Sequence, residues 1–406
     1  DIEPGVIANI GTGHTISISQ TNSTFADDSY LRLNGNPIGN LTINLNGKTA
    51  FFRETPVIEG ALTVIDGILN FENFDATVNG SSTINGTLKF GNGDYDFNGG
   101  FDASGGGIDF NANGNLYVST GNPLFGDLDN ILGNIVLDGT SLQTINQALT
   151  FSTFSINNPN GILLLAPLEV STSLTLNTGI IFVSSPYSVK LLSTCNIVGT
   201  PNVNSHISGT LLRDVDSNLD YLFPVGDGTV YRPVVLTPEG TTASTFSVTY
   251  NNTAHSSISY DQNGNNNTPC EIGLDHVSGG NWWDISRESG SENCYVGINW
   301  DANSGVDSPN NIRLTHWTGS EWENLGEIIT GFNGTGVATN SAGRVRSNLY
   351  VSSFSPFNLG SIGGGGNALP IELLSFNASC YQNSVLVEFS VLSQINNEKF
   401  FIERST

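Results

Sequence analysis

The sequence predicts an all-β protein, and three observations support this expectation. The 406 residues include 47 glycines, together with abundant Asn, Ser and Thr and very few Lys. The apolar residues come in short alternating runs, such as Ile16 and Ile18, which end at Gly or Asn-Gly. No helical periodicity extends beyond about two turns. Val, Ile, Thr and Phe favour pleated strands, whereas Gly, Asn and Asp favour the turns between them.

Residues 1–205 predict a β-solenoid-like stack of short strands. Apolar runs recur at irregular spacings of roughly 7 to 20 residues. In a solenoid each rung adds inward apolar residues, and only the neighbouring rungs complete the core. A pair of ordinary sandwiches is the alternative, but it would need longer strands and fewer glycines. We expect strands at His14–Ser19, Leu41–Leu45, Leu62–Ile65, Leu69–Phe71, Leu88–Phe90, Tyr95–Phe97, Ile108–Phe110, Leu116–Val118, Ile135–Leu137, Phe154–Ile156, Ile162–Leu165, Leu174–Leu176 and Ile180–Val183.

Two further β modules are expected after the solenoid. Residues 206–265 predict a connecting module with strands at Ile207–Leu212, Leu222–Val225, Tyr231–Leu236 and Phe246–Tyr250. Residues 266–362 contain all five tryptophans and predict a β-sandwich. Its strands are expected near Trp283–Ser286, Tyr295–Trp300, Ile312–Trp317 and Phe354–Leu359. A Gly-rich hinge is predicted at residues 363–368.

Residues 369–406 predict an incomplete immunoglobulin-like strand set. Three strands are expected, at Pro370–Ser379, Ser384–Leu392 and Lys399–Arg404. A complete immunoglobulin-like domain has about seven strands. Three strands with apolar faces therefore need a partner, and we expect this segment to pair between subunits.

The charge balance excludes two classes of partner. The chain has 13 basic and 37 acidic residues, for a net charge of -24. It therefore lacks the basic surface that nucleic acids or anionic membranes require. No apolar run reaches the roughly 18 residues of a membrane-spanning helix. Methionine is absent, including at position 1, so we expect that a secretory signal has been removed and that the protein is secreted.

The four cysteines are Cys195, Cys270, Cys294 and Cys380, which allow three pairings if all are oxidised. Cys270 and Cys294 flank one segment of the predicted sandwich. In an exported protein a disulfide between them is the expected pairing, with buried free thiols as the alternative. No Cys or His spacing indicates zinc.

Five segments of the chain carry a resemblance to a known family. They are Ile156-Asn157-Asn158-Pro159-Asn160-Gly161-Ile162, Phe223-Pro224-Val225-Gly226 with Tyr231-Arg232-Pro233, Trp300-Asp301 with His316-Trp317, Phe354-Ser355-Pro356-Phe357, and Leu369-Pro370-Ile371-Glu372-Leu373-Leu374-Ser375-Phe376 with Asn396-Asn397-Glu398-Lys399-Phe400. These segments resemble large secreted cell-surface, adhesin-like proteins of Bacteroidota that the type IX secretion system exports. The resemblance is strongest at the C-terminal end and covers roughly residues 150–406, whereas the earlier part is similar only in style.

The resemblance implies a surface or extracellular location and an adhesive or structural role, and it does not imply an enzyme. In that family the last of these segments, which begins at Leu369, opens the C-terminal module that precedes the sorting signal. The usual remainder of the module and the sorting domain are missing here. We expect either that export removes them or that the chain is a naturally shortened, assembled form.

Catalytic motifs are scarce in the sequence. There is no GxSxG, HExxH or Walker loop, and the five histidines have no metal-ligand spacing. An acidic group of Asp94, Asp96, Asp102 and Asp109 resembles the carboxylates of polysaccharide-degrading solenoids. However, these residues lie among glycines, where Asp is expected in turns. We therefore expect no catalytic residues and no required cofactor.

Two loops have the alternating oxygen ligands of a Ca²⁺ site. One contains Asp301, Asn303 and Asp307, and the other runs Asp261-x-Asn263-x-Asn265. A solvated turn is the alternative reading of both.

The tryptophans predict either core packing or a platform on which sugars stack. Strand alternation favours core positions for Trp283, Trp300 and Trp317, and leaves Trp282 and Trp322 as the exposed candidates.

The expected function is a non-enzymatic structural subunit of an extracellular filament or adhesive fibre. Other copies of the chain are its expected partners, joined by β-strand exchange or augmentation. A monomeric adhesin that binds surface glycans is the first alternative, and a polysaccharide-degrading enzyme is the second. Which end of the chain donates the strand stays open. The predicted apolar anchors are Ile371, Leu374, Phe376, Val385, Val387, Phe389, Phe400 and Ile402.

Overall fold

The computed structural model describes residues 14–19, 29–33, 35–119, 121–129, 131–259, 268–363, 373–381 and 384–391. It confirms the predicted all-β class, with 53% of residues in strands and 2% in helices. The described helices are two short 3-10 turns, η1 (Ala302–Ser304) and η2 (Pro309–Asn311). The chain divides into two units, residues 1–207 and 208–406, close to the predicted boundary at residue 205.

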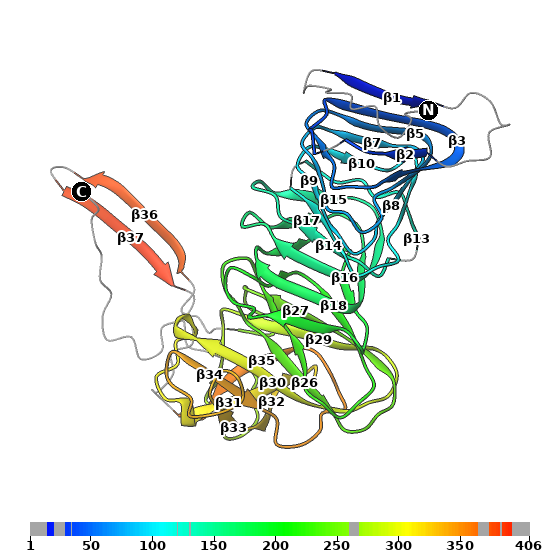
Figure 1. Ribbon diagram of the computed structural model, residues 1–406. Helices are drawn as coiled ribbons and strands as arrows, with labels where there is room; N and C mark the ends of the chain where they lie inside the picture. Colours follow the sequence, from blue (N-terminus) through cyan, green and yellow to red (C-terminus); the bar gives the residue numbers. More distant parts are fainter. Residues whose placement is uncertain are drawn as a thin grey trace. The chain divides into compact units, whose positions relative to one another are not determined.

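The first unit is a β-solenoid of about 10 turns, as the sequence predicts. Its strands stack in parallel on the strands of the next turn (Figure 1). One sheet contains β1 (Thr15–Ser19), β2 (Ser29–Leu31), β3 (Asn40–Phe52), β5 (Leu62–Asn70), β7 (Ser82–Ile84), β8 (Thr87–Lys89), β10 (Phe101–Asp102), β11 (Gly107–Asp109) and β13 (Asp127–Asp129).

Two more stacks of strands complete the solenoid. The longer one contains β4 (Val57–Ile58), β6 (Ala76–Val78), β9 (Asp94–Phe97), β12 (Asn115–Val118), β14 (Asn134–Leu137), β16 (Leu149–Asn157), β18 (Leu168–Thr178), β20 (Val189–Leu191) and β21 (Asn196–Gly199). The shorter one contains β15 (Gln143–Ile145), β17 (Ile162–Leu164) and β19 (Ile181–Val183). β22 (Ile207–Ser208) spans the division between the two units.

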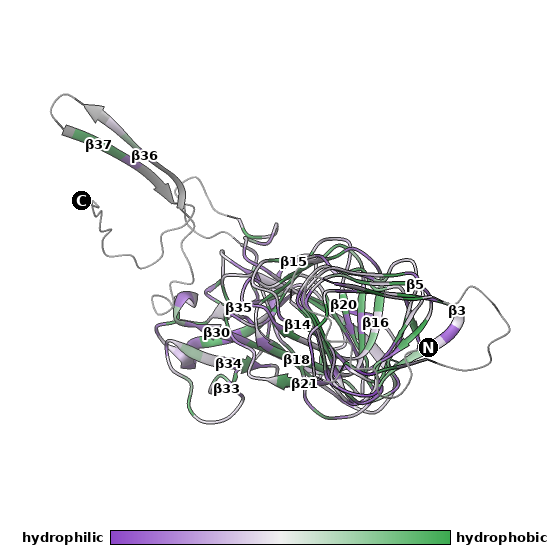
Figure 2. Ribbon diagram, turned by 45° about the horizontal axis from the view of Figure 1, so that its top comes forward, coloured by the Kyte–Doolittle hydropathy of each residue, from purple (hydrophilic) through white to green (hydrophobic). Residues whose placement is uncertain are grey.

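Stacked apolar side chains form the solenoid core. Phe52, Phe71, Phe90 and Phe110 occupy one column, with ring centroids 5.4, 5.4 and 5.3 Å apart from one turn to the next. All four are buried. Hydrophobic and hydrophilic residues mix along the stacked strands (Figure 2), because successive side chains of a strand point to opposite faces. Each inward residue therefore packs on its equivalents in the neighbouring turns.

Glycines lie where the backbones of neighbouring solenoid turns approach most closely. A Cβ atom at Gly80 would overlap the carbonyl oxygen of Gly60, and one at Gly99 would overlap that of Gly80. The approach of one backbone to the next leaves no space for a side chain. This column explains part of the high glycine content of the sequence.

The second unit contains a sandwich of two antiparallel sheets. The first sheet runs β23 (Leu211–Val215), β27 (Ser244–Asn251), β29 (Trp282–Ser289), β35 (Phe357–Ser361), β31 (Ile312–Trp317) and β32 (Trp322–Gly326), and β28 (His276–Val277) pairs with β35. The second runs β24 (Tyr221–Phe223), β26 (Val234–Pro238), β30 (Cys294–Asp301), β34 (Ala342–Arg346) and β33 (Ile328–Thr330). A short strand, β25 (Val225–Gly226), precedes β26.

The structure corrects one predicted domain boundary. The sequence suggested separate modules at 206–265 and 266–362, but strands from the two segments pair with each other. β26 pairs with β30, and β27 pairs with β29. Neither segment could form its sheets alone, so together they make one sandwich.

The remaining strands, β36 (Leu373–Tyr381) and β37 (Ser384–Val391), form a separate antiparallel sheet of two strands (Figure 1). We refer to this pair as the C-terminal ribbon. They confirm two of the three strands predicted for residues 369–406. The third, Lys399–Arg404, lies outside the described residues, as does part of the predicted hinge.

Candidate functional site

The C-terminal ribbon is the first candidate site, because it holds most of the predicted assembly anchors. Its register pairs Phe376 with Phe389, and Ala378 with Val387. Val385 and Val387 lie two residues apart in β37 and so share one face. Val385 is 63% exposed and Val387 is half-buried.

The ribbon pairs with no other described strand. A two-stranded sheet is marginally stable by itself in water. Leu374, Phe376 and Phe389 lie within its strands, whereas the predicted anchors Ile371, Phe400 and Ile402 lie outside the described residues. The ribbon is therefore a two-stranded sheet with no neighbouring strand among the described residues.

Four aromatic side chains gather around one loop and form the second candidate site. Trp282 begins β29, and Trp317 ends β31 opposite Trp322 of β32. The ring of His255, in the loop after β27, lies 4.9 Å from that of Trp282, 6.3 Å from that of Trp317 and 5.6 Å from that of Trp322. We refer to His255, Trp282, Trp317 and Trp322 as the aromatic cluster.

The structure corrects one of the two predicted sugar-stacking residues. Trp322 is fully buried, and its indole nitrogen donates to Ser257 Oγ at 2.9 Å. Trp282 is half-buried, as a platform residue would be, and so is Trp317, which the sequence assigned to the core. Trp283 and Trp300 are fully buried as predicted. Strand alternation could not show that the 255–257 loop covers Trp322 and not Trp317.

The predicted disulfide between Cys270 and Cys294 is not formed, and both residues are free thiols. They belong to different sheets of the sandwich. Cys294 begins β30 and pairs with Val351, whereas Cys270 bridges to Trp322 at the edge of the other sheet. Burial raises the pKa of Cys294 to about 12 and that of Cys270 to about 11. Both thiols therefore stay protonated at neutral pH and are poor nucleophiles.

The carboxylate of Asp301, the first residue of the predicted calcium loop, already has protein partners. It caps η1 by accepting from the Asn303 amide at 2.7 Å, and it forms an ion pair with Arg232. Asn303 and Asp307 are exposed. The described residues contain no group of three or more His, Cys, Asp or Glu that could hold a metal. The second predicted loop, at 261–265, lies outside the described residues.

The four aspartates that the sequence analysis considered as carboxylates of a degrading enzyme, and set aside as turn residues, do not form one cluster. Asp94 and Asp96 lie on β9, whereas Asp109 on β11 belongs to another sheet and forms an ion pair with Lys89 at 3.0 Å. Asp102 accepts from the Ser104 hydroxyl at 2.6 Å. Instead, Asp94 and Asp96 are close to Asp75 and Asp138 of neighbouring turns. Partial burial and these three carboxylates raise the pKa of Asp96.

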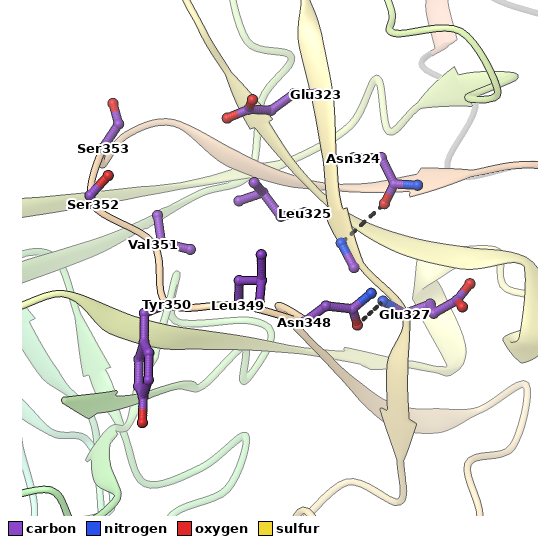
Figure 3. Close-up of a pocket in the computed structure, with 11 residues that line it drawn as sticks. Glu323, Asn324, Leu325, Glu327, Asn348, Leu349, Tyr350, Val351, Ser352 and Ser353 are labelled. Carbon is purple, nitrogen blue, oxygen red and sulfur yellow. Dashed lines mark hydrogen bonds between the residues drawn. The ribbon is translucent and has the colours of Figure 1, made fainter. Parts of the chain in front are cut away.

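A pocket of about 460 Å³ lies beside the end of β32 in the second unit. Leu325, Leu349 and Val351 gather at it, while Tyr350 points away (Figure 3). Its two carboxylates are already paired, Glu323 with His316 at 2.8 Å and Glu327 with Arg313 at 2.6 Å. Both carboxylates at the pocket therefore already have a partner on a neighbouring strand.

Comparisons with known proteins found no match to a protein-family model, to a curated protein or to a solved structure. The resemblance to type IX-exported surface proteins therefore stays a prediction. No helix in the described part of the chain is long and apolar enough to span a membrane.

Proposed function

We propose that the protein is a structural subunit of an extracellular filament or surface fibre, and that its copies join by β-strand pairing through the C-terminal ribbon. The observation that carries the proposal is the pairing of β36 and β37 with each other and with no other described strand. A second copy would supply the missing partner.

The exposed apolar residues of the ribbon supply the free energy for this contact. Val385 is 63% exposed, and Val387 lies two residues further along β37 on the same face. Fully burying one aliphatic side chain of this size contributes about 1.5–3 kcal/mol. Backbone hydrogen bonds along the added strand would fix its position, as in other cases of β-augmentation.

We propose the edge of β1 in the next copy as the acceptor. Among the described strands, β1 pairs only with β3, so its other edge has no described partner. Its sequence, Thr-Ile-Ser-Ile-Ser, contains none of the Lys or Pro residues that commonly block sheet edges. Such a contact joins the C-terminal ribbon of one copy to β1 of the next, so it is heterologous. Repeated from copy to copy, it builds a filament unless the rotation between successive copies closes a ring.

The net charge of -24 is compatible with such a fibre. Charge of one sign keeps assembled particles apart at low salt. The charge acts between fibres, whereas β1 and β36 carry no charged residue and β37 carries only Glu388.

Electron microscopy of the full chain and two matched variants tests the proposal. Val387→Asp adds a carboxylate to the face shared with Val385, and Leu386→Asp adds the same charge at the next residue, on the other face. We expect filaments from the unmodified chain and from Leu386→Asp, and single particles from Val387→Asp. Ser17→Lys, on the exposed side of β1, should also stop growth. Filaments of normal length from Val387→Asp would exclude this mechanism.

A further inference from the structure

Two tryptophans of the second unit differ from the other three in their hydrogen bonding. The buried Trp283, Trp300 and Trp322 donate their indole N–H to Arg232 O, Thr339 O and Ser257 Oγ at 3.0, 3.0 and 2.9 Å. Trp282 and Trp317 are half-buried, and their indole N–H groups donate to no described residue. Buried polar groups normally have partners, so these two donors are directed to solvent or to a ligand.

His255 lies between these two tryptophans and adds a third donor. The backbone amide of Ser257 donates to His255 Nδ1 at 3.2 Å, which makes Nδ1 an acceptor. A neutral imidazole carries its proton on the other nitrogen in that case, so Nε2 is a donor. Nε2 has no partner among the described residues. Burial lowers the pKa of His255, which keeps the ring neutral at physiological pH.

Asp284 provides an acceptor beside the cluster. Its carboxylate lies on β29, two residues after Trp282, and its charge acts on His255. It accepts from Ser355 Oγ at 2.5 Å and from Ser286 Oγ at 3.4 Å. A carboxylate offers about four acceptor positions, so it can accept further hydrogen bonds.

We infer that the aromatic cluster binds a neutral saccharide. Indole faces provide flat apolar surface, and the three N–H donors and one carboxylate match the hydroxyl groups of a sugar, which both donate and accept. Asp284 and the net charge of -24 disfavour an acidic sugar. The sequence indicated Trp282 but not Trp317, because only the structure shows which ring the 255–257 loop covers. This inference does not depend on filament assembly.

Titration of the full chain with neutral oligosaccharides tests the inference. The panel contains glucose, galactose, mannose and N-acetylglucosamine oligomers, and the readouts are calorimetry and tryptophan fluorescence. We expect saturable binding to at least one class. Trp282→Ala and Trp317→Ala should each weaken it by about tenfold or more, as truncation of a central aromatic contact does.

Three controls make the result decisive. Leu349→Ala, at a residue that is 77% exposed in the same unit but outside the cluster, should bind like the unmodified chain. Trp317→Phe keeps an aromatic face but removes the donor, so it should retain part of the affinity. Microscopy should show that Trp282→Ala assembles normally, which separates this test from that of the proposed function. The inference is wrong if no panel member binds, if Trp282→Ala binds equally well, or if the cluster binds choline instead of sugars.

Discussion

Asn98 donates a side-chain hydrogen bond from Nδ2 to Oδ1 of Asn79, 19 residues earlier in the chain, at 3.0 Å. Asn79 in turn donates to Glu59 at 2.8 Å, and Ser119 donates to Asn98 at 3.3 Å. A second column of this kind joins Asp94, Asn115, Asn134 and Ser155. Polar side chains therefore follow the same repeat as the core, one turn above another. This repeat explains some of the asparagines of the solenoid.

Replacing Asn98 should test this polar column. Asn98→Ala removes the side-chain hydrogen bonds to Asn79 and Ser119 at an exposed position, and it should lower the free energy of unfolding by about 0.5–1.5 kcal/mol. Urea denaturation followed by circular dichroism measures the change. Asn177→Ala is the control, because Asn177 is exposed and outside both columns. Equal effects of the two substitutions would show that the column does not stabilise the fold.

Replacing Phe71 should test the aromatic column of the core. Phe71 is fully buried, with Phe52 and Phe90 both 5.4 Å away. Phe71→Ala should cost about 3–5 kcal/mol, the usual range for a buried phenylalanine. Phe71→Leu fills more of the space and should cost clearly less. A loss below about 1 kcal/mol for Phe71→Ala would contradict the packing described here.

Removing the charge of Asp96 should stabilise the solenoid at neutral pH. The pKa of Asp96 is raised in the folded state, so the folded chain holds this proton to a higher pH than the unfolded chain does. Stability therefore falls as pH rises from the unfolded pKa through the folded pKa, and the penalty persists above it. Asp96→Asn should raise the free energy of unfolding at pH 7 by up to about 0.5 kcal/mol. The gain should disappear near pH 3, and a gain that persists there would point to another cause.

The environment of His255 should make the sandwich less stable in mild acid. Burial lowers the pKa of His255 below 6.5 in the folded state, so the unfolded chain binds this proton first. Stability should fall as pH decreases from 6.5 to the folded pKa and then level off with respect to this group. His255→Gln should remove this part of the pH dependence in thermal unfolding between pH 7 and 5. An unchanged profile would show that His255 does not titrate in this way.

The sequence was sufficient to predict the class of fold but not the repeat. Paired residues of adjacent turns are 19 to 25 positions apart, as in Leu116 with Ile135 and Ile16 with Leu41. Short apolar runs and Asn-Gly turns revealed the strands, because they reflect local backbone preferences. The pairing of strands depends on contacts between turns. Loops of different lengths between the strands obscure the spacing of paired residues in the sequence.

The candidate sites depend still more on long-range contacts. The C-terminal strands were predictable from alternation alone. The packing of the two sheets and of the 255–257 loop buries Trp322 and leaves Trp317 half-buried. The same packing places Cys270 and Cys294 in different sheets. Neighbours in the sequence carry no signal for such packing, so the predictions for these residues were wrong.

Hydrogen–deuterium exchange at increasing protein concentration tests the central claim most directly. If copies join through the C-terminal ribbon, the backbone amides of residues 384–391 should exchange freely in dilute protein and become protected as assemblies form. Amides in the solenoid core, such as those of β14, should keep the same protection throughout and serve as an internal reference. Exchange at 384–391 that stays equally fast in dilute and concentrated protein would contradict assembly by strand pairing at this ribbon.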